Sequence, residues 1–104
     1  MNRDDRVVAE GLKYQGVDEL LIYSLTTTPW GSTPTSVAVK AYDESAASAD
    51  VTATVLSGSA SVVGDVITLP TLKSLTADHA YRIEIKFSAD GSTWEAILPV
   101  LAQR

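Results

Sequence analysis

Cysteine is absent from the 104 residues of this chain, and that absence excludes several classes of protein at once. Disulfide-bonded scaffolds, thiolate metal sites and cysteine nucleophiles all require a side chain that the sequence does not contain. We therefore expect packing and hydrogen bonds alone to hold the fold together.

Basic residues are scarce as well, because eight Lys and Arg stand against thirteen Asp and Glu, which gives a net charge of −5. Binding to nucleic acid or to an anionic membrane surface relies on Lys and Arg. No apolar run approaches the roughly 20 residues that span a bilayer, and no signal-peptide segment follows the charged residues 1–6. We expect no nucleic acid and no membrane among the partners, and synthesis in a cytoplasm.

Residues able to do chemistry are few, and His79 is the only histidine. Catalysis by a serine hydroxyl needs a base and an orienting group, and a metal site needs several converging ligands. His79 lies in a polar turn without such neighbours in sequence, so we interpret it as a solvated turn residue. We expect no catalytic residue, no metal and no cofactor, and hence a protein that is not an enzyme.

Two carboxylates invite comparison with a glycosidase, because Glu84 and Glu95 could face each other on neighbouring strands. Glu84 lies between Arg82 and Lys86, which favours a solvated cross-strand charge network instead. Other carboxylates lie in loops, where aspartate is simply a common turn residue, and calcium binding is the alternative although no loop shows the ligand pattern of a calcium site. These residues are Asp43, Glu44, Asp50, Asp65, Asp78 and Asp90.

The sequence is rich in Val, Thr, Ser and Ala, which favours β-sheet because β-branched side chains pack well on a pleated surface. Short apolar or alternating runs recur between Gly, Pro and Asp at the spacing typical of a β-sandwich. The predicted fold class is all-β. About seven antiparallel strands are expected, over residues 20–25, 36–43, 51–55, 61–63, 66–69, 81–87 and 94–98.

The clearest strand is Tyr81–Phe87, where apolar residues at odd positions alternate with charged residues at even positions. We predict that its apolar face packs into an interior shared by two β-layers. Asp90-Gly91, which follows it, and Gly64-Asp65 are two-residue turn signals that predict hairpins.

Three further strand predictions rest on shorter patterns. The run from Leu20 to Leu25 is apolar almost throughout, which indicates a strand buried on both sides or nearly so. Residues 51–55 alternate between apolar and Thr side chains and predict a strand with its apolar side chains inward. Pro99 marks the end of the last strand or an edge position, because proline cannot donate to a ladder.

The N-terminal residues 1–17 form a polar lead, which we interpret as an extended arm or a short irregular element. Residues 18–104 then form the sandwich domain. An arm of this kind could order against a neighbouring subunit. Its candidate interface residues are Val7, Val8, Leu12 and Tyr14.

The two tryptophans are the other candidates for contact with a partner. Trp94 opens the last predicted strand, where packing in the core is equally natural. Trp30 lies in a loop between proline and glycine residues, which favours either an interface residue or a residue that anchors the loop.

The segment from Leu75 to Tyr81 resembles the tyrosine corner of fibronectin type III and related immunoglobulin-like domains, with the Leu, a short turn and the Tyr six residues later. The resemblance implies that Tyr81 buries its ring while its hydroxyl bonds backbone at a corner between strands. Ala77-Asp78 replaces the Pro-Gly pair common in fibronectin modules, and the cysteine pair of antibody-type domains is absent. The implied fold is an immunoglobulin-like β-sandwich.

The whole chain also resembles small immunoglobulin-like structural proteins of tailed bacteriophages, in its charged N-terminal lead and its acidic, cysteine-free sandwich, with residues 15–25 and 28–31 carrying the likeness. The resemblance implies a virion component of a head or tail that docks to capsid or tail subunits, or to copies of itself, after synthesis in the host cytoplasm. The alternative is a carbohydrate-binding or adhesive module of a bacterial cell surface, with Trp30 or Trp94 stacking on sugar.

Overall fold

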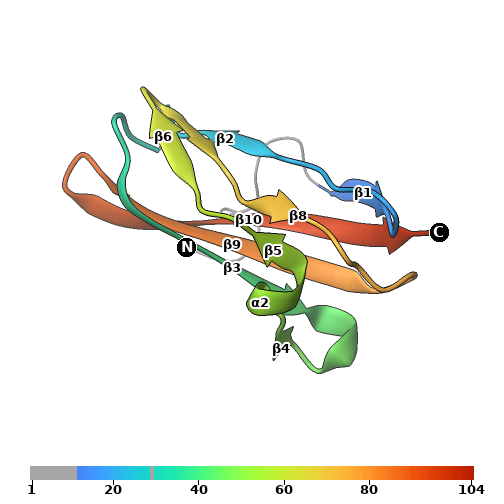
Figure 1. The fold of residues 1–104 in the computed structure, drawn as a ribbon. Coiled ribbons are helices and arrows are strands. Elements are labelled where there is room, and N and C mark those ends of the chain that lie inside the picture. The colour runs from blue at the N-terminus through green and yellow to red at the C-terminus, as the bar shows by residue number, and fades with distance from the viewer. Residues whose placement is uncertain (1–11, 29) are drawn as a thin grey trace.

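The computed structural model describes residues 12–28 and 30–104, and they form three β-sheets with two short helical turns (Figure 1). The largest sheet has the order β1-β10-β9-β3-β4, with bounds Lys13–Gly16, Ser92–Gln103, Ala80–Ala89, Thr35–Asp43 and Ala49–Asp50. A second has the order β2-β7-β6, with bounds Ser24–Thr26, Val66–Thr68 and Ser61–Val63. The third pairs β5 (Leu56–Ser57) with β8 (Thr71–Leu72). The predicted all-β class is confirmed.

The two helical turns are the 3₁₀ helix η1 (Glu44–Ala46) and the four-residue α2 (Thr52–Val55). No helix in the described part of the chain has the length and hydropathy to cross a membrane.

Strand β9 confirms the prediction made from its alternating pattern. Tyr81, Ile83, Ile85 and Phe87 are each at most 2% exposed, and they pack in one cluster with side chains of the three-stranded sheet, Leu25 of β2 and Ile67 of β7 among them. The charged residues at even positions lie on the opposite face of β9. Side chains alternate between the two faces of a strand, so the apolar residues of β9 all point to the same side. Because they pack there against β2 and β7, the five-stranded sheet and the β2-β7-β6 sheet face each other across one core.

Both hairpins predicted from turn signals are present. β9 and β10 are joined by Asp90 and Gly91, with φ of 50° and 81°, and β6 and β7 are joined by Gly64 and Asp65, with φ of 59° at the glycine. Positive φ at the first turn position matches the twist of paired strands, and glycine adopts it without steric cost.

Tyr81 makes the contact that the Leu75–Tyr81 spacing implied. Its hydroxyl accepts a hydrogen bond of 2.7 Å from the Thr76 N–H. Tyr81 is 2% exposed and Leu75 6% exposed. The ring is therefore buried while its polar tip satisfies a backbone donor in the connection before β9, as predicted.

The prediction of a strand over residues 51–55 is wrong, since Thr52–Val55 form α2. The Asp50 carboxylate accepts hydrogen bonds from the Thr52 N–H (3.0 Å) and hydroxyl (2.7 Å), and these bonds lower the pKa of Asp50. Asp50 thus turns the chain away from β3 after only two paired residues of β4. Val51 and Val55 are four residues apart, a spacing that suits one face of a helix as well as one face of a strand.

The prediction that Leu20–Leu25 is buried on both sides is also wrong. Only Ser24 and Leu25 of this run belong to β2, and burial alternates, with Leu20 67% and Ile22 63% exposed whereas Leu25 is 7% exposed. The reason is that only one face of this segment meets the core, where Tyr23 and Leu25 pack, while the other face meets solvent.

The predicted boundary between an arm and a domain at residue 17 lies inside the five-stranded sheet. Residues 1–11 of the predicted arm lie outside the described residues. Lys13–Gly16 form β1, which pairs in parallel with β10 from Val100 to Gln103. Gln15 of β1 is fully buried, so at least this part of the predicted arm belongs to the five-stranded sheet.

Strand β10 continues through Pro99 to Gln103 instead of ending there. Ala102 donates to the His79 carbonyl on the β9 side, so the alternation of a ladder points the Pro99 nitrogen toward the β1 side. β1 pairs with β10 only from Val100 onward. Pro99 therefore costs no described ladder bond, in keeping with a local edge position.

Candidate interaction surface

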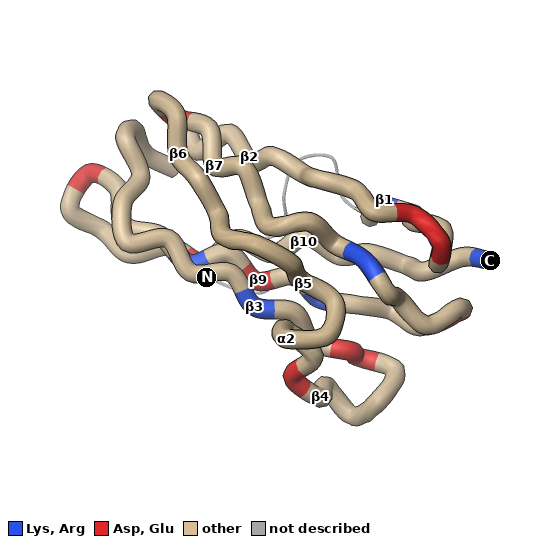
Figure 2. The backbone as a smooth tube through the Cα atoms, in the orientation of Figure 1, with Lys and Arg blue, Asp and Glu red and all other residues tan. Residues whose placement is uncertain are grey.

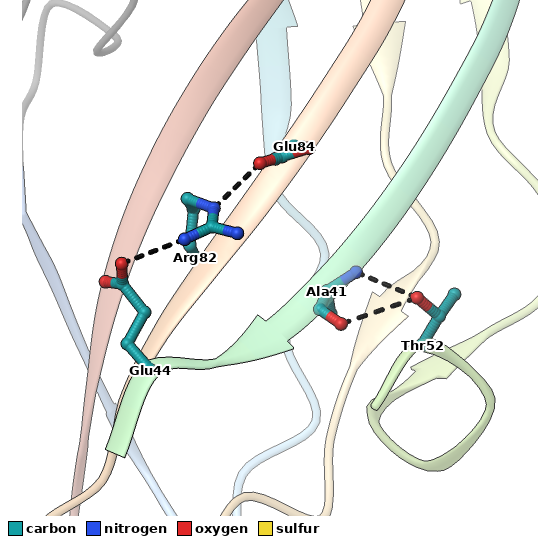
Figure 3. Close-up of polar contacts among 5 residues, drawn as sticks. All are labelled: Ala41, Glu44, Thr52, Arg82 and Glu84. Atoms are coloured by element: carbon teal, nitrogen blue, oxygen red, sulfur yellow. Dashed lines mark hydrogen bonds and ion pairs between the residues drawn. The ribbon is translucent and has the colours of Figure 1, made fainter. Parts of the chain in front are cut away.

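The outer face of the five-stranded sheet carries a network of paired charges (Figure 3). The Arg82 Nε donates to Glu84 at 2.7 Å and its Nη1 donates to Glu44 at 3.1 Å, and the guanidinium lies 4.7 Å from the centre of the Tyr42 ring. Burial alone would lower the pKa of Arg82, but the hydrogen bonds and charges of Glu84 and Glu44 raise it above its ordinary value. Arg82 is therefore held as a cation between two carboxylates.

A shallow depression of about 320 Å³ lies on the same face, across β3, β9 and β10. Opposite charges face each other across its strands, because Lys40 is paired in register with Glu84, and Glu95 with Lys86. The ion pair of Glu84 with Arg82 lies within β9 rather than across strands, and Arg82 also binds Glu44, which follows β3. The remaining lining residues are Ala38 and Tyr42.

Asp65 and Asp90, which the sequence offered as turn residues or calcium ligands, hold the loop between β2 and β3. Asp65 accepts from the Thr33 N–H at 2.9 Å and from the Thr28 hydroxyl at 3.1 Å. Asp90 accepts from the N–H (3.1 Å) and hydroxyl (3.3 Å) of Ser32. N–H and O–H donors thus occupy both carboxylates, and among the described residues no group of three or more His, Asp or Glu could hold a metal ion.

Trp30 and Trp94 are partly buried and pack against the core. The Trp30 ring meets the Phe87 ring edge to face, with centroids 6.1 Å apart and planes at 63°, a favoured geometry for aromatic pairs. Of the two roles predicted for Trp30, this contact is that of a residue that anchors its loop.

His79 is less solvated than expected. Its Nδ1 lies 2.8 Å from the Asp43 carboxylate, whose side chain is 8% exposed. The other Asp43 oxygen accepts from the Ser45 N–H and caps η1, and the Ser45 hydroxyl accepts from the Ala80 N–H. His79 therefore joins the start of β9 to the end of β3, which is a structural role.

Large exposed apolar side chains gather in and around β1 and its connection to β2. Leu12 is 45% exposed, Tyr14 57%, Leu20 67% and Ile22 63%. Gln15 of β1 and Tyr23 before β2 meet through a hydrogen bond, so by the alternation of a strand Tyr14 lies on the outward face of β1, and Leu20 and Ile22 share the outward face of the segment before β2. We call Leu20 and Ile22 the β1–β2 surface. Leu12 and Tyr14 were predicted interface residues, whereas Val7 and Val8 lie outside the described residues.

Buried polar contacts behind this surface fix β1 in place. The Gln15 amide donates to the carbonyls of Leu72 (2.8 Å) and Glu19 (3.1 Å), and its oxygen accepts from the Tyr23 hydroxyl at 2.9 Å. Burial, and to a lesser degree the charge of Glu19, raise the pKa of Tyr23. The Gln15 side chain thus ties β1 to β2 and β8, with its donors and acceptor all engaged.

Glu19 closes the outer edge of β1. Its carboxylate accepts from the Gly16 N–H at 2.6 Å, and its N–H donates to the Gly16 carbonyl at 3.1 Å. A Cβ at Gly16 would meet this carboxylate at 3.0 Å. The backbone groups at the end of β1 are therefore satisfied within the chain, one of the ways in which proteins protect an edge strand.

Sequence reasoning missed both residues of the β1–β2 surface, Leu20 and Ile22, because it assigned them to a buried strand. The signal available was their spacing, since Leu20, Ile22 and Ser24 alternate with Leu21, Tyr23 and Leu25. Sequence reasoning also missed Gln15, because no local sequence pattern predicts that its side chain is buried.

Comparisons with known proteins identify no relative. No protein-family model, no curated protein and no solved structure matches this chain.

Proposed function

We propose that the chain is an immunoglobulin-like module that works by docking to protein partners through the β1–β2 surface, by contact and without catalysis. The observation that carries the proposal is the exposure of two large apolar side chains, Leu20 at 67% and Ile22 at 63%, on the outward face of the segment that leads into β2.

Strand order supports the immunoglobulin-like assignment. In an immunoglobulin sandwich, strands C, F and G form one sheet and strands B, E and D belong to the other. Assigned in chain order, β3, β9 and β10 correspond to C, F and G, and β2, β7 and β6 correspond to B, E and D. The hydrogen bond of Tyr81 lies near the start of the strand that corresponds to F, where the tyrosine corner is found.

Exposed apolar side chains of this size support docking. Grouped apolar residues on a protein surface mark interaction sites more often than scattered ones, and interface cores are enriched in aromatic residues and depleted of charge. The charged face of β3, β9 and β10 is a weaker candidate, because the charges of Arg82, Glu84 and Glu44 are engaged with one another.

The setting that we propose is a bacteriophage head or tail, with capsid or tail subunits as partners. Its support is the resemblance in composition and in the N-terminal segment. Sugar binding, the alternative, has less support because Trp30 and Trp94 pack against the core.

The test is incorporation of the chain into particles. Particles are purified by density gradient from cells that produce the tagged full chain, and the chain is quantified in them by mass spectrometry. We expect Leu20→Asp and Ile22→Asp to lower incorporation about tenfold or more, the size of effect typical of interface hot spots. Thr93→Asp, at an exposed residue of β10, is the control and should incorporate normally.

Deletion of residues 2–11 tests the role of the N-terminal segment without removing β1. A deletion extended to residue 17 would remove a strand of the sheet and the partner of the Tyr23 hydroxyl, so it would confound folding with docking. Normal incorporation of both aspartate variants would overturn the proposal, as would binding to a glycan array that is lost in Trp30→Ala.

A further inference from the structure

Strand β6 is an edge strand whose outward backbone groups have no described partner. It pairs only with β7 in the sheet order β2-β7-β6. On β7, the Asp65 carbonyl and the Leu69 N–H bond to β2, so by the alternation of an antiparallel ladder Val66 and Thr68 bond to β6. Val62, which lies opposite Ile67, therefore directs its N–H and C=O away from the sheet.

The side chains of this edge are apolar and exposed. Val63 is 79% exposed, Val62 38% and Val66 of the adjacent strand 36%. Charge, proline and bulges are the usual devices that protect an edge strand, and residues 51–64 contain neither a charged residue nor a proline. Figure 2 shows the uncharged tube along α2, β5 and β6.

We propose that β6 is a self-association edge, at which a second copy of this chain adds its own β6 in antiparallel orientation. With a two-fold axis at Val62, the N–H and C=O of Val62 in each copy meet the C=O and N–H of Val62 in the other. The two three-stranded sheets then continue as one six-stranded sheet, and the edge strand of each copy is covered.

A second copy fits this edge for two reasons. The open groups are self-complementary, as the same patch on both subunits of a two-fold dimer must be. Each chain also carries a net charge of −5, and an edge without charges lets two such chains meet with the least repulsion. Because β6 has only three residues, the contact is weak for an isolated pair and gains from the high local concentration of an assembly.

Single-cysteine cross-linking tests the register directly, because the chain has no other thiol. In the proposed pairing the two Val62 Cα atoms are about 5.5 Å apart, within the range of a disulfide. The two Val63 Cα atoms are about 8 Å apart, because each lies one residue of roughly 3.3 Å from the axis. Val62→Cys should therefore form a disulfide dimer about tenfold faster than Val63→Cys under mild oxidation.

Val63→Cys and Ser24→Cys are the matched controls. Val63 is the more exposed valine of the two, so random collision would make Val63→Cys the faster variant. Ser24 lies on β2, the opposite edge of the same sheet. Faster cross-linking of either control would overturn the proposal, and circular dichroism checks that all three variants keep the fold.

Sedimentation of the unmodified chain gives a second readout that does not depend on cysteine variants. The average mass should rise above the 11.0 kDa of the monomer as protein concentration increases, and more so at high salt, which screens the like charges. Val63→Lys should restore the monomer mass. A monomer at millimolar concentration would overturn the proposal. Leu20→Asp and Ile22→Asp should leave this association unchanged, so its failure is distinguishable from failure of docking at the β1–β2 surface.

Discussion

β1 and β6 are both short edge strands, yet their chemistry differs. β1 is tied to β2 and β8 by the buried Gln15 and is closed at its outer edge by Glu19. β6 has three exposed residues, and its outward groups have no described partner. The comparison indicates that an edge is protected by specific polar contacts rather than by its small size.

Removal of the Gln15 side chain should have the largest effect on stability. Gln15→Ala removes one of the two hydrogen bonds to the Leu72 carbonyl, leaves the Tyr23 hydroxyl without its partner and creates a cavity, so we expect a loss of about 2–4 kcal/mol in the free energy of unfolding. Urea denaturation measures it. Val62→Ala on β6 should cost about 1 kcal/mol or less. Equal losses at the two positions would show that the strands are held alike.

Tyr23→Phe should have the next largest effect, about 1 kcal/mol at neutral pH, because one hydrogen bond to Gln15 is lost. The raised pKa of Tyr23 means that the folded state holds the phenolic proton more tightly than the unfolded chain does. The contribution of Tyr23 to the free energy of unfolding is therefore complete below about pH 10, and it declines as pH rises above that value.

Thermal unfolding between pH 8 and pH 11 checks this dependence. Tyr23→Phe should lose stability less steeply above pH 10 than the unmodified chain. Parallel curves for the two proteins would contradict the assignment of the alkaline loss to Tyr23.

Glu19→Ala should open the edge of β1 at a modest cost. We expect a loss of about 0.5–1 kcal/mol, because the bond to the Gly16 N–H is exposed to water. Light scattering should also show more aggregation at high concentration, since an unprotected edge can pair with other chains. Asp18→Ala, at the exposed neighbouring carboxylate, is the control and should change neither property.

Val63→Lys on β6 should have the smallest effect on stability. The side chain is 79% exposed, and surface substitutions of this kind usually stay within about 0.5 kcal/mol. A loss above about 1.5 kcal/mol in urea denaturation would show that Val63 contributes to the folded monomer, and β6 would then resemble β1.

The parts of the fold that could be predicted are those in which local pattern and final environment agree. β9 is central in its sheet, so its alternating side chains meet core on one face and water on the other. The turns at Asp90-Gly91 and Gly64-Asp65 require positive φ at particular residues, and the sequence supplies residues that tolerate it.

The failures lie where the environment is set by distant residues. The exposure of Leu20 and Ile22 depends on which face of the segment before β2 packs against the core, which is a property of the whole fold. Gln15 is buried beside Leu72, which is 57 residues away in the sequence and whose carbonyl accepts from the Gln15 amide. The two residues of the β1–β2 surface could not be predicted for the same reason, since exposure of an apolar residue is decided by which strands pack beside it.

The parallel pairing of β1 with β10 has a mechanical consequence. Lys13 lies beside Val100 and Gly16 beside Gln103, so a force that pulls residues 12 and 104 apart slides one strand along the other. The hydrogen bonds of the pair are then loaded together in shear, whereas a hairpin pulled at its open end would unzip bond by bond. Tension along the chain is therefore resisted first by the hydrogen bonds between β1 and β10, the first and last strands in the described sequence.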